Sequence, residues 1–335
     1  MQKILIVQLR QLGDILLTTP HLRAVRKAFP KAQIDFLSHD MGKLILKNNP
    51  YLTSHITYNE KQTLLSSLKL MGFLRRQRYD LVIDFMYNPR SALLSAATAA
   101  KRRVAFPSRR NWFYTDIILQ PKESIYIVKE KFELTNSVGI ENAGIGLDLP
   151  FEKKDARVFL DFVSENQIKL DTDLLVCLSP THRRVERIWP EQRYAELADQ
   201  LTSLGRFKIV WLWGPGEKDF VERARSLMKS SSFLAPRTSF SELAAFIANC
   251  DYFIGNSNGP SHVAVAGDTP SLQLHGPTIA KTWCPNDERH RSIQKASMDD
   301  ITTEEVLQSF TALSTDIENK VGQKHEKGVR MHWQD

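Results

Sequence analysis

Short apolar runs alternate with segments of helical periodicity along most of the chain. The first run, residues 4–9, is rich in β-branched residues, as is typical of a central strand buried on both faces. Further strands are expected at 34–38, 55–58, 81–85, 174–179, 208–213, 252–255 and 271–274. Helical patterns lie between them, at 14–29, 41–48, 64–77, 91–99, 190–204, 217–229, 243–248 and 260–266. This alternation predicts an α/β fold with parallel sheets covered by helices.

The alternation is interrupted once, at residues 139–155, which contain three Gly residues and Pro150. We interpret this segment as the link between two Rossmann-like domains with a cleft between them, at 1–150 and 151–321. The polar segment 322–335 is expected to be a mobile tail. No short-period repeat is present.

The connection after the first strand holds a candidate catalytic residue. Gly13 permits a tight turn, and Asp14 opens the helical pattern, so Asp14 is expected where the carboxyl end of a strand meets a ligand crevice. A structural alternative is that Asp14 is only the helix N-cap. Downstream, Pro20 is expected to kink the helix, unless Thr19 caps a new helix that has Pro20 as its first residue.

Three strand-to-helix turns of the second half are expected to line one crevice. They are 179–190, 214–217 and 256–262, the last followed downstream by 276–278. Backbone amides and arginines of the first turn are suited to a phosphate. Glu217 of the second is suited to a ribose, although a first-turn Glu also interacts favourably with the helix dipole. The third supplies neutral donors and allows close backbone approach, through Ser257, Asn258, Gly259, Ser261, Gly276 and Thr278.

Charge is distributed unevenly between the two halves. Residues 1–150 contain 22 Lys and Arg against 12 Asp and Glu, whereas the remainder contains 23 against 26. The basic half is expected to attract an anionic partner, although some of these residues are expected only to form solvated faces. Residues 101–116 interleave basic and aromatic side chains, which indicates an RNA-like or membrane-surface patch, or a strand and loop at a domain edge.

Several classes of protein are disfavoured by composition. The three cysteines are far apart and form no CxxC motif, so neither a disulfide framework nor a zinc site is predicted. No apolar run approaches the roughly 18 residues of a membrane span, and a cytoplasmic location is expected. No GxGxxG follows a strand and no GxxxxGK[ST] occurs, which disfavours a dehydrogenase or a P-loop enzyme.

Three separated motifs resemble the bacterial heptosyltransferases of glycosyltransferase family 9. They are LRQLGDILLTTPHLRAVRKAFP, RIWPEQRYAELADQL and IGNSNGPSHVAVAGDTPSLQLHGPT. The resemblance implies a GT-B fold and an inverting, metal-independent transfer that needs no cofactor. Heptose would pass from ADP-L-glycero-β-D-manno-heptose to the lipid A/Kdo inner core of lipopolysaccharide. We expect transient contact with the anionic inner face of the inner membrane and no nucleic-acid partner.

The resemblance also assigns roles. It makes Asp14 the catalytic base, and it puts Arg187 where the family has a phosphate-binding Lys. The residues expected to bind the donor are Thr181, Glu217, Ser257, Asn258, Gly259, His262, Gly276, Pro277 and Thr278. Those expected to bind the acceptor are Arg10, Gly13, Lys61, Arg90, Arg109 and Arg110. Ser257 departs from the family pattern, which has Asp at this position.

Two alternatives differ in substrate or in class. The nearer is a GT-B glycosyltransferase that uses another nucleotide sugar or a protein acceptor. The farther is a non-enzymatic binder of nucleic acid or anionic lipid, for which the basic first half is the argument. His262 and His275 are candidates for catalysis, with a hydrogen-bonded structural His as the alternative for each.

Overall fold

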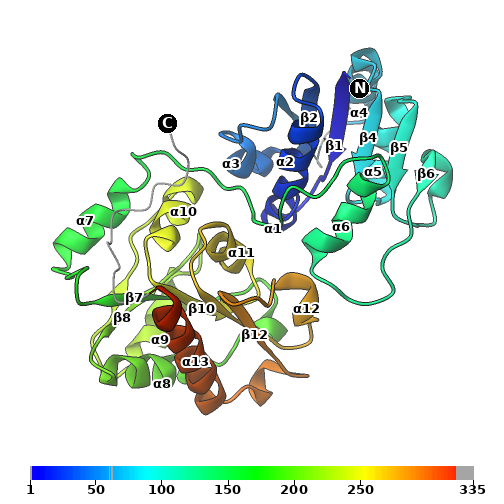
Figure 1. The fold of residues 1–335 in the computed structure, drawn as a ribbon. Coiled ribbons are helices and arrows are strands. Elements are labelled where there is room, and N and C mark those ends of the chain that lie inside the picture. Colours follow the sequence, from blue (N-terminus) through cyan, green and yellow to red (C-terminus); the bar gives the residue numbers. More distant parts are fainter. Residues whose placement is uncertain (1, 60, 62, 322–335) are drawn as a thin grey trace. The chain divides into compact units, whose positions relative to one another are not determined.

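A computed structural model describes residues 2–59, 61 and 63–321. The chain divides into two compact units, residues 1–149 and 150–335, and the boundary falls inside the segment 139–155. The expected mobile tail, 322–335, lies outside the described residues. Each unit is an open parallel sheet flanked by helices (Figure 1). The predicted α/β class with parallel sheets is therefore confirmed.

Unit 1, residues 1–149, contains a six-stranded sheet in the order β3-β2-β1-β4-β5-β6, with every pair parallel. Its strands are β1 (Lys3–Val7), β2 (Gln33–His39), β3 (Ser54–Tyr58), β4 (Leu81–Asp84), β5 (Arg102–Ala105) and β6 (Asp116–Ile117). Its α-helices are α1 (Leu12–Leu16), α2 (Thr19–Ala28), α3 (Lys43–Leu46), α4 (Leu64–Gln77), α5 (Pro89–Ala97) and α6 (Ile127–Asn136). Two 3₁₀ turns are η1 (Asp40–Gly42) and η2 (Asn111–Phe113).

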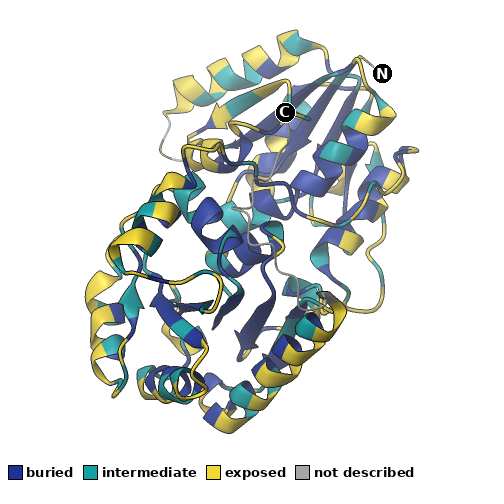
Figure 2. Ribbon diagram, turned by 60° about the vertical axis from the view of Figure 1, so that its left-hand side comes forward, coloured by how far each residue is buried: buried dark blue, intermediate teal, exposed yellow. Residues whose placement is uncertain are grey.

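The apolar run that begins the chain forms the central strand, β1. Its residues Ile4 to Val7 are fully buried, because β2 and β4 pair with its two edges and helices cover its faces. Figure 2 shows the same pattern in the strands of the sheet, which are buried, whereas the helices alternate between buried and exposed positions. A continuous apolar strand without polar alternation is what burial on both faces requires.

Unit 2, residues 150–335, repeats this architecture, with strands in the order β12-β11-β10-β7-β8-β9. Its strands are β7 (Leu174–Ser179), β8 (Phe207–Trp211), β9 (Phe233–Leu234), β10 (Tyr252–Asn256), β11 (Ser271–His275) and β12 (His290–Gln294). Its α-helices are α7 (Arg157–Glu165), α8 (Glu191–Ser203), α9 (Lys218–Ser226), α10 (Phe240–Ala248), α11 (Gly259–Ala266), α12 (Ala280–Trp283) and α13 (Thr303–Val321). Two 3₁₀ turns are η3 (Val185–Arg187) and η4 (Met298–Asp300).

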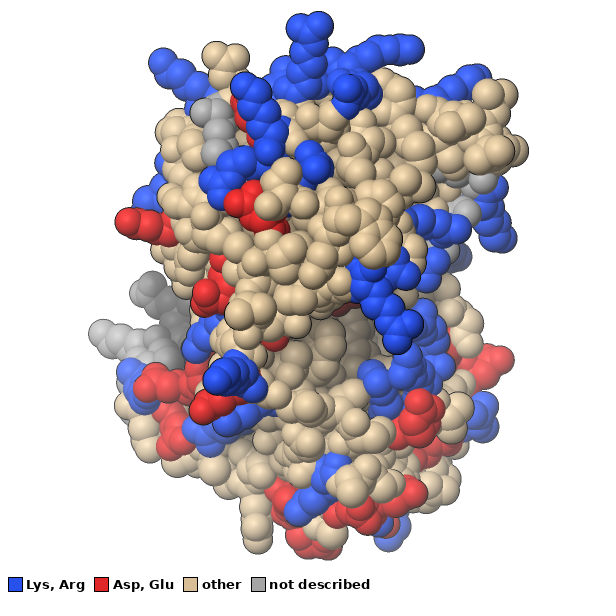
Figure 3. All heavy atoms as spheres, turned by 90° about the vertical axis from the view of Figure 1, so that its right-hand side faces the viewer, with Lys and Arg blue, Asp and Glu red and all other residues tan. Residues whose placement is uncertain are grey.

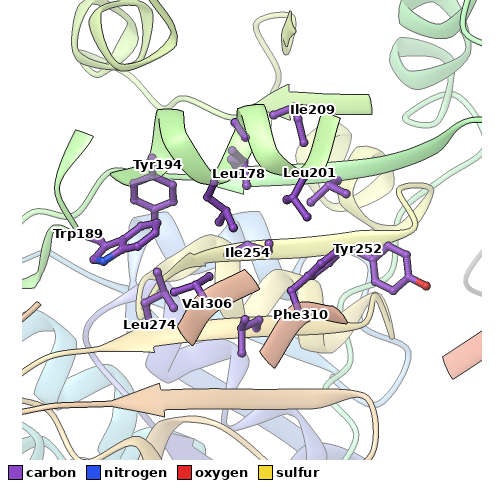
Figure 4. Close-up of a cluster of buried hydrophobic side chains, with 14 of the residues drawn as sticks. Leu178, Trp189, Tyr194, Leu201, Ile209, Tyr252, Ile254, Leu274, Val306 and Phe310 are labelled. Atoms are coloured by element: carbon purple, nitrogen blue, oxygen red, sulfur yellow. The ribbon is translucent and has the colours of Figure 1, made fainter. Parts of the chain in front are cut away.

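The core of unit 2 is rich in aromatic rings. Phe310 of α13 packs edge-on against Phe207 and Tyr252, with ring centroids 5.3 and 5.2 Å apart. Trp189, just before α8, packs in the same way on Tyr194 at 4.8 Å (Figure 4). Such rings bury large apolar areas and prefer this geometry, so they attach α8 and α13 firmly to the sheet.

Several elements were not predicted, and one local prediction was wrong. The additions are α6, α7, α12, α13, β6, β9 and β12. The helix expected at 41–48 is divided into η1 and the single turn α3. Of the two alternatives for Pro20, the new helix is confirmed to within one residue: α1 ends at Leu16, and α2 starts at Thr19 with Thr18, not Thr19, in the cap position.

Candidate functional site

The order of strands in unit 1 reverses between β1 and β4. From β1 the chain adds β2 and β3 on one side, and it then returns to add β4, β5 and β6 on the other. In open α/β sheets, ligands bind in the crevice outside the carboxyl ends of the strands at such a switch point. The connection after β1 leads into α1, whose third residue is Asp14. Asp14 therefore lies at the position where this fold binds ligands.

The turn into α1 is not formed as predicted. Gly13 lies inside the helix, and the positive φ of 56°, with ψ of 128°, falls instead on Gln11. This conformation is costly for a residue with a side chain, at about 1–3 kcal/mol, and such residues cluster at functional sites. Gln11 is the N-cap, so the interpretation of Asp14 as a cap is wrong.

The charge of a buried lysine, Lys131, influences the pKa of the Asp14 carboxyl group. Burial raises the pKa of Asp14, and the positive charge of Lys131 opposes that rise. Lys131, on α6, is 5% exposed, and its Nζ donates to Thr18 Oγ1 at 3.2 Å. The Thr18 hydroxyl in turn donates to the carbonyl oxygen of Asp14 at 2.7 Å. Sequence reasoning missed Lys131, since a Lys in a helix is normally solvated.

The residues expected to contact an acceptor follow the carboxyl ends of four strands. They are Arg10 and Gly13 after β1, Lys61 after β3, Arg90 after β4, and Arg109 and Arg110 after β5. Because the strands are parallel, these connections all lie at the carboxyl-terminal ends of the strands, on the same side of the sheet. Arg90 also stacks over the ring of Tyr58, 5.5 Å from its centroid.

Part of the basic charge of unit 1 is structural. Arg102 pairs with Asp116 at 3.1 Å, and Arg103 donates to the carbonyl oxygen of Phe113 at 2.8 Å. Both arginines therefore stabilise the sheet edge at β5 and β6, and residues 101–116 form a strand and loop there, as one of the alternatives predicted. On the face seen in Figure 3, Lys and Arg still predominate over unit 1, whereas unit 2 carries both signs.

In unit 2 the order of strands reverses between β7 and β10, and Asn256 joins the two connections there. This fully buried residue ends β10. Its Oδ1 accepts from the backbone N–H of Trp189 at 3.2 Å and from the hydroxyl of Tyr194 at 3.1 Å, and its Nδ2 donates to the carbonyl oxygen of Pro180 at 2.8 Å. Asn256 thus holds both ends of the segment 180–189, which includes Arg187.

Three predicted donor-binding residues are hydrogen-bonded to one another. Thr181 Oγ1 donates to Glu217 Oε2 at 2.8 Å, and Asn258 Nδ2 donates to the carbonyl oxygen of Thr181 at the same distance. Glu217 Oε2 also accepts from the N–H of Gly214 at 2.8 Å. Asn258 Oδ1 caps α11 by accepting from the N–H of Ser261 at 3.1 Å. Among the described residues, no donor occupies Glu217 Oε1, which leaves that oxygen for a ligand.

Three other side chains near the carboxyl ends of the unit 2 strands have buried polar atoms without a partner among the described residues. They are Arg187 Nε, His262 Nδ1 and His275 Nε2. Burial lowers the pKa of each histidine to about 4, and for His275 the charge of Arg187 adds to the effect. Both imidazoles are therefore neutral at pH 7. His275 Nδ1 lies 3.4 Å from Thr278 Oγ1, as expected of a structural histidine.

The remaining predicted residues border the same strand ends. Ser257 follows β10 directly, and Gly259 begins α11. After β11, a Cβ added to Gly276 would lie 3.0 Å from the backbone nitrogen of Met298, a tight contact that favours glycine there. Pro277 is exposed and Thr278 is buried.

In the described ranges 2–59, 61 and 63–321, no group of three or more His, Cys, Asp or Glu side chains is arranged to hold a metal ion. In the same part of the chain, no helix combines the length and apolarity needed to cross a bilayer.

Comparisons with known proteins agree with this architecture. The sequence model of glycosyltransferase family 9 (heptosyltransferase) matches residues 67–308. Lipopolysaccharide heptosyltransferase 3 of Escherichia coli K12 is 28% identical over 293 residues, which cover 83% of each chain. A crystal structure of a family 9 glycosyl transferase from Veillonella parvula superposes with a TM-score of 0.83 at 22% identity, covering 94% of this chain and 97% of that one. For Escherichia coli heptosyltransferase WaaC with ADP-2-deoxy-2-fluoro heptose the TM-score is 0.71 at 21% identity, with 93% and 99% covered.

Proposed function

Because this chain belongs to glycosyltransferase family 9 (heptosyltransferase), we propose that it transfers heptose from ADP-L-glycero-β-D-manno-heptose to the lipid A/Kdo inner core of lipopolysaccharide. In this proposal unit 1 binds the acceptor and unit 2 binds the nucleotide sugar. The observation that carries the proposal is that the candidate residues of each unit follow the carboxyl ends of its parallel strands, with Asp14 and Asn258 at the two switch points. The ADP-heptose analogue named with the WaaC structure supports the choice of donor.

The donor site is assigned to the hydrogen-bonded loops of unit 2. Glu217 Oε1 accepts from the ribose hydroxyls, while Oε2 stays bonded to Thr181. Arg187 binds the diphosphate, for which a planar guanidinium is suited because it can donate two parallel hydrogen bonds. Backbone N–H groups near Gly259 and Thr278 complete the site.

The reaction is an inverting displacement at the anomeric carbon. Asp14 takes the proton of the acceptor hydroxyl as its oxygen bonds to that carbon, and the bond from carbon to the ADP oxygen breaks. The electron pair leaves with ADP, whose growing negative charge is stabilised by Arg187, so neither a metal nor a protonated leaving group is needed. General-base catalysis of this kind contributes about 10² to 10⁴ in rate.

Replacement of Asp14 by Asn tests the proposal. The variant is expected to fold and to bind ADP with unchanged affinity, because Asn is nearly isosteric and the nucleotide site is assigned to unit 2. Transfer of heptose to purified lipid A/Kdo acceptor, followed by mass spectrometry, is expected to fall by about 10² or more. Turnover close to wild type would show that Asp14 is not the base.

The serine at position 257 is the observation that favours an alternative donor. The family has Asp at this position, and a hydroxyl cannot accept as many hydrogen bonds from a sugar as a carboxylate can. We therefore propose, as the alternative, a different nucleotide sugar or weaker sugar contacts at this site. Ser257→Asp is expected to raise transfer from ADP-heptose if the contact is merely weakened. An unchanged or lower rate, together with ADP release from another sugar nucleotide, would favour the different donor.

Contact with the membrane surface is proposed for α4. Its outward face exposes three leucines, Leu64 at 79%, Leu65 at 62% and Leu68 at 55%. Arg75 and Arg76 are exposed in the last turn of the same helix. Leucines that enter the interface and arginines that attract anionic headgroups are the combination found in helices that lie on membranes. Contact with the membrane would bring the enzyme to the proposed acceptor, which is anchored in a bilayer.

A further inference from the structure

Lys131 carries a charge that the proposed mechanism does not yet use. It is 5% exposed, and its ammonium lies 5.7 Å from the centroid of the Phe85 ring. Its Nζ donates to Thr18 Oγ1, and among the described residues it forms no ion pair with a carboxylate. Burial of an ammonium without a paired carboxylate is costly. Because burying the ammonium is costly, we expect Lys131 to have a function that needs a positive charge.

The hydrogen bonds around Thr18 connect this charge to Asp14. The hydroxyl of Thr18 accepts from Lys131 Nζ at 3.2 Å and donates to the carbonyl oxygen of Asp14 at 2.7 Å. Because an ammonium can only donate, Lys131 fixes the direction in which the Thr18 hydroxyl points. The short helix α1 is thereby connected to α6 through the Thr18 hydroxyl.

We propose that Lys131 is a positioning residue for Asp14, whose buried ammonium keeps the carboxylate ionised and holds α1 in place through Thr18. This inference rests on the proposed function, in which Asp14 is the general base. A base has to be unprotonated to accept the proton of the acceptor hydroxyl. Without a nearby positive charge, burial alone favours the neutral carboxylic acid, which cannot act.

The groups around the two residues are consistent with this role. Burial lowers the pKa of Lys131, whereas Asp14 and Glu130 oppose that change. His21, packed against Phe132 at 4.3 Å, has a pKa well below its ordinary value because of burial and the charges of Lys131 and Arg23. Its ring is therefore neutral.

Tyr87 also interacts with Asp14. Burial is the main cause that raises its pKa, and the Asp14 carboxylate adds to the rise, so the phenol is neutral near pH 7. With Tyr87 and His21 both neutral, Lys131 is the group that opposes the effect of burial on the pKa of Asp14.

The acidic limb of the pH profile of kcat/KM tests the inference. If the pKa of Asp14 in the folded protein rises, Asp14 becomes protonated at a higher pH, and activity is lost at a higher pH. Lys131→Gln keeps a donor for Thr18 but removes the charge, and its acidic limb is expected to move upward by about 1 pH unit, for a roughly tenfold loss on the acidic side. Lys131→Arg keeps the charge and is expected to restore the wild-type limb.

The matched control is Lys129→Met, which removes a charge from an exposed position on the same helix and is expected to leave the profile unchanged. Thr18→Val keeps the ammonium but breaks the link to α1, so it is expected to lower kcat without moving the limb. If Lys131→Gln does not fold, the inference is tested by Lys131→Met and Thr18→Val.

An unshifted limb in a folded charge-removing variant would overturn the inference. The result for Asp14→Asn separates this failure from failure of the proposed function. An active Asp14→Asn enzyme removes Asp14 as the base, whatever Lys131 does. An inactive Asp14→Asn enzyme together with an unshifted Lys131→Gln profile refutes only the role given to Lys131.

Discussion

Replacement of Asn256 by Ala is expected to destabilise unit 2 and to weaken nucleotide binding together. The carboxamide is fully buried and bonds to Trp189, Tyr194 and Pro180. The Tyr194 hydroxyl keeps a second acceptor, the carbonyl oxygen of Ser179 at 3.3 Å. The N–H of Trp189 and the carbonyl oxygen of Pro180 lose their side-chain partner. At about 1–3 kcal/mol for each orphaned group, the free energy of unfolding is expected to fall by about 2–6 kcal/mol.

The unfolding of unit 2 can be followed separately. Five of the six tryptophans of the sequence belong to unit 2, namely Trp189, Trp211, Trp213, Trp283 and Trp333, and Trp112 belongs to unit 1, so intrinsic fluorescence during urea unfolding reports chiefly on unit 2. Analysis of that transition alone is appropriate, because a protein of two units need not unfold in one step.

ADP affinity, measured by isothermal titration calorimetry, is the second readout. It is expected to fall in Asn256→Ala, because the segment that carries Arg187 loses its attachment to β10. Asn319→Ala, on the exposed face of α13, is the control and is expected to stay within about 0.5 kcal/mol of wild type. A loss of stability below about 1 kcal/mol for Asn256→Ala, with ADP affinity unchanged, would refute the reasoning.

Three further changes test other parts of the molecule. Arg187→Ala is expected to weaken ADP binding by about tenfold or more in the same titration, since charge-assisted hydrogen bonds contribute about 1.5–3 kcal/mol; equal losses in exposed Arg184→Ala would mean that the effect is only one of net charge. Ser239→Ala removes the hydroxyl of the capping box of α10 and is expected to cost about 1 kcal/mol in urea unfolding. Replacement of the three exposed leucines of α4 by Ser is expected to reduce flotation with phosphatidylglycerol vesicles by about tenfold, whereas Ser at the exposed Leu204 and Leu227 of unit 2 is expected to have no effect.

The βα units were predictable because their signal is local. The strand at residues 174–179 was predicted with the bounds of β7, and the helix at 64–77 with those of α4. The capping box formed by Ser239 and Glu242 also lies within four residues of sequence, and both of its hydrogen bonds are present. Apolar runs, helical spacing and caps depend on neighbours in the chain, which the sequence displays directly.

The elements that were missed differ in cause. β12 has the sequence HRSIQ, which lacks an apolar run, and it forms because the edge of β11 offers unpaired backbone groups. In α13, by contrast, Val306, Phe310, Leu313 and Ile317 follow helical spacing and are all buried, so a usable signal was present. Sequence periodicity therefore predicts a packed helix better than an edge strand, whose pairing partner is remote.

The candidate site shows the same division. A charged residue within a helix predicts a solvated face, and nothing local to Lys131 indicates that α2 and the connection after β4 cover it with Thr18, His21 and Phe85. Its burial depends on packing between segments more than 40 residues apart in sequence. Asn256 belonged to a motif that was recognised, but its three hydrogen bonds depend on residues 62–76 positions away.

The polar residues of unit 2 divide into those that build the site and those left to bind. Both amide atoms of Asn258 bond within the protein, as do those of Asn256, so these side chains connect the loops of the site to one another. Arg187 Nε and Glu217 Oε1, by contrast, have no partner among the described residues. A buried donor without a partner costs about 1–3 kcal/mol, and a ligand anion that supplies the missing acceptor recovers it on binding. The asparagines therefore determine the geometry of the loops, and the affinity for a diphosphate nucleotide is assigned to the arginine and the glutamate that they hold in place.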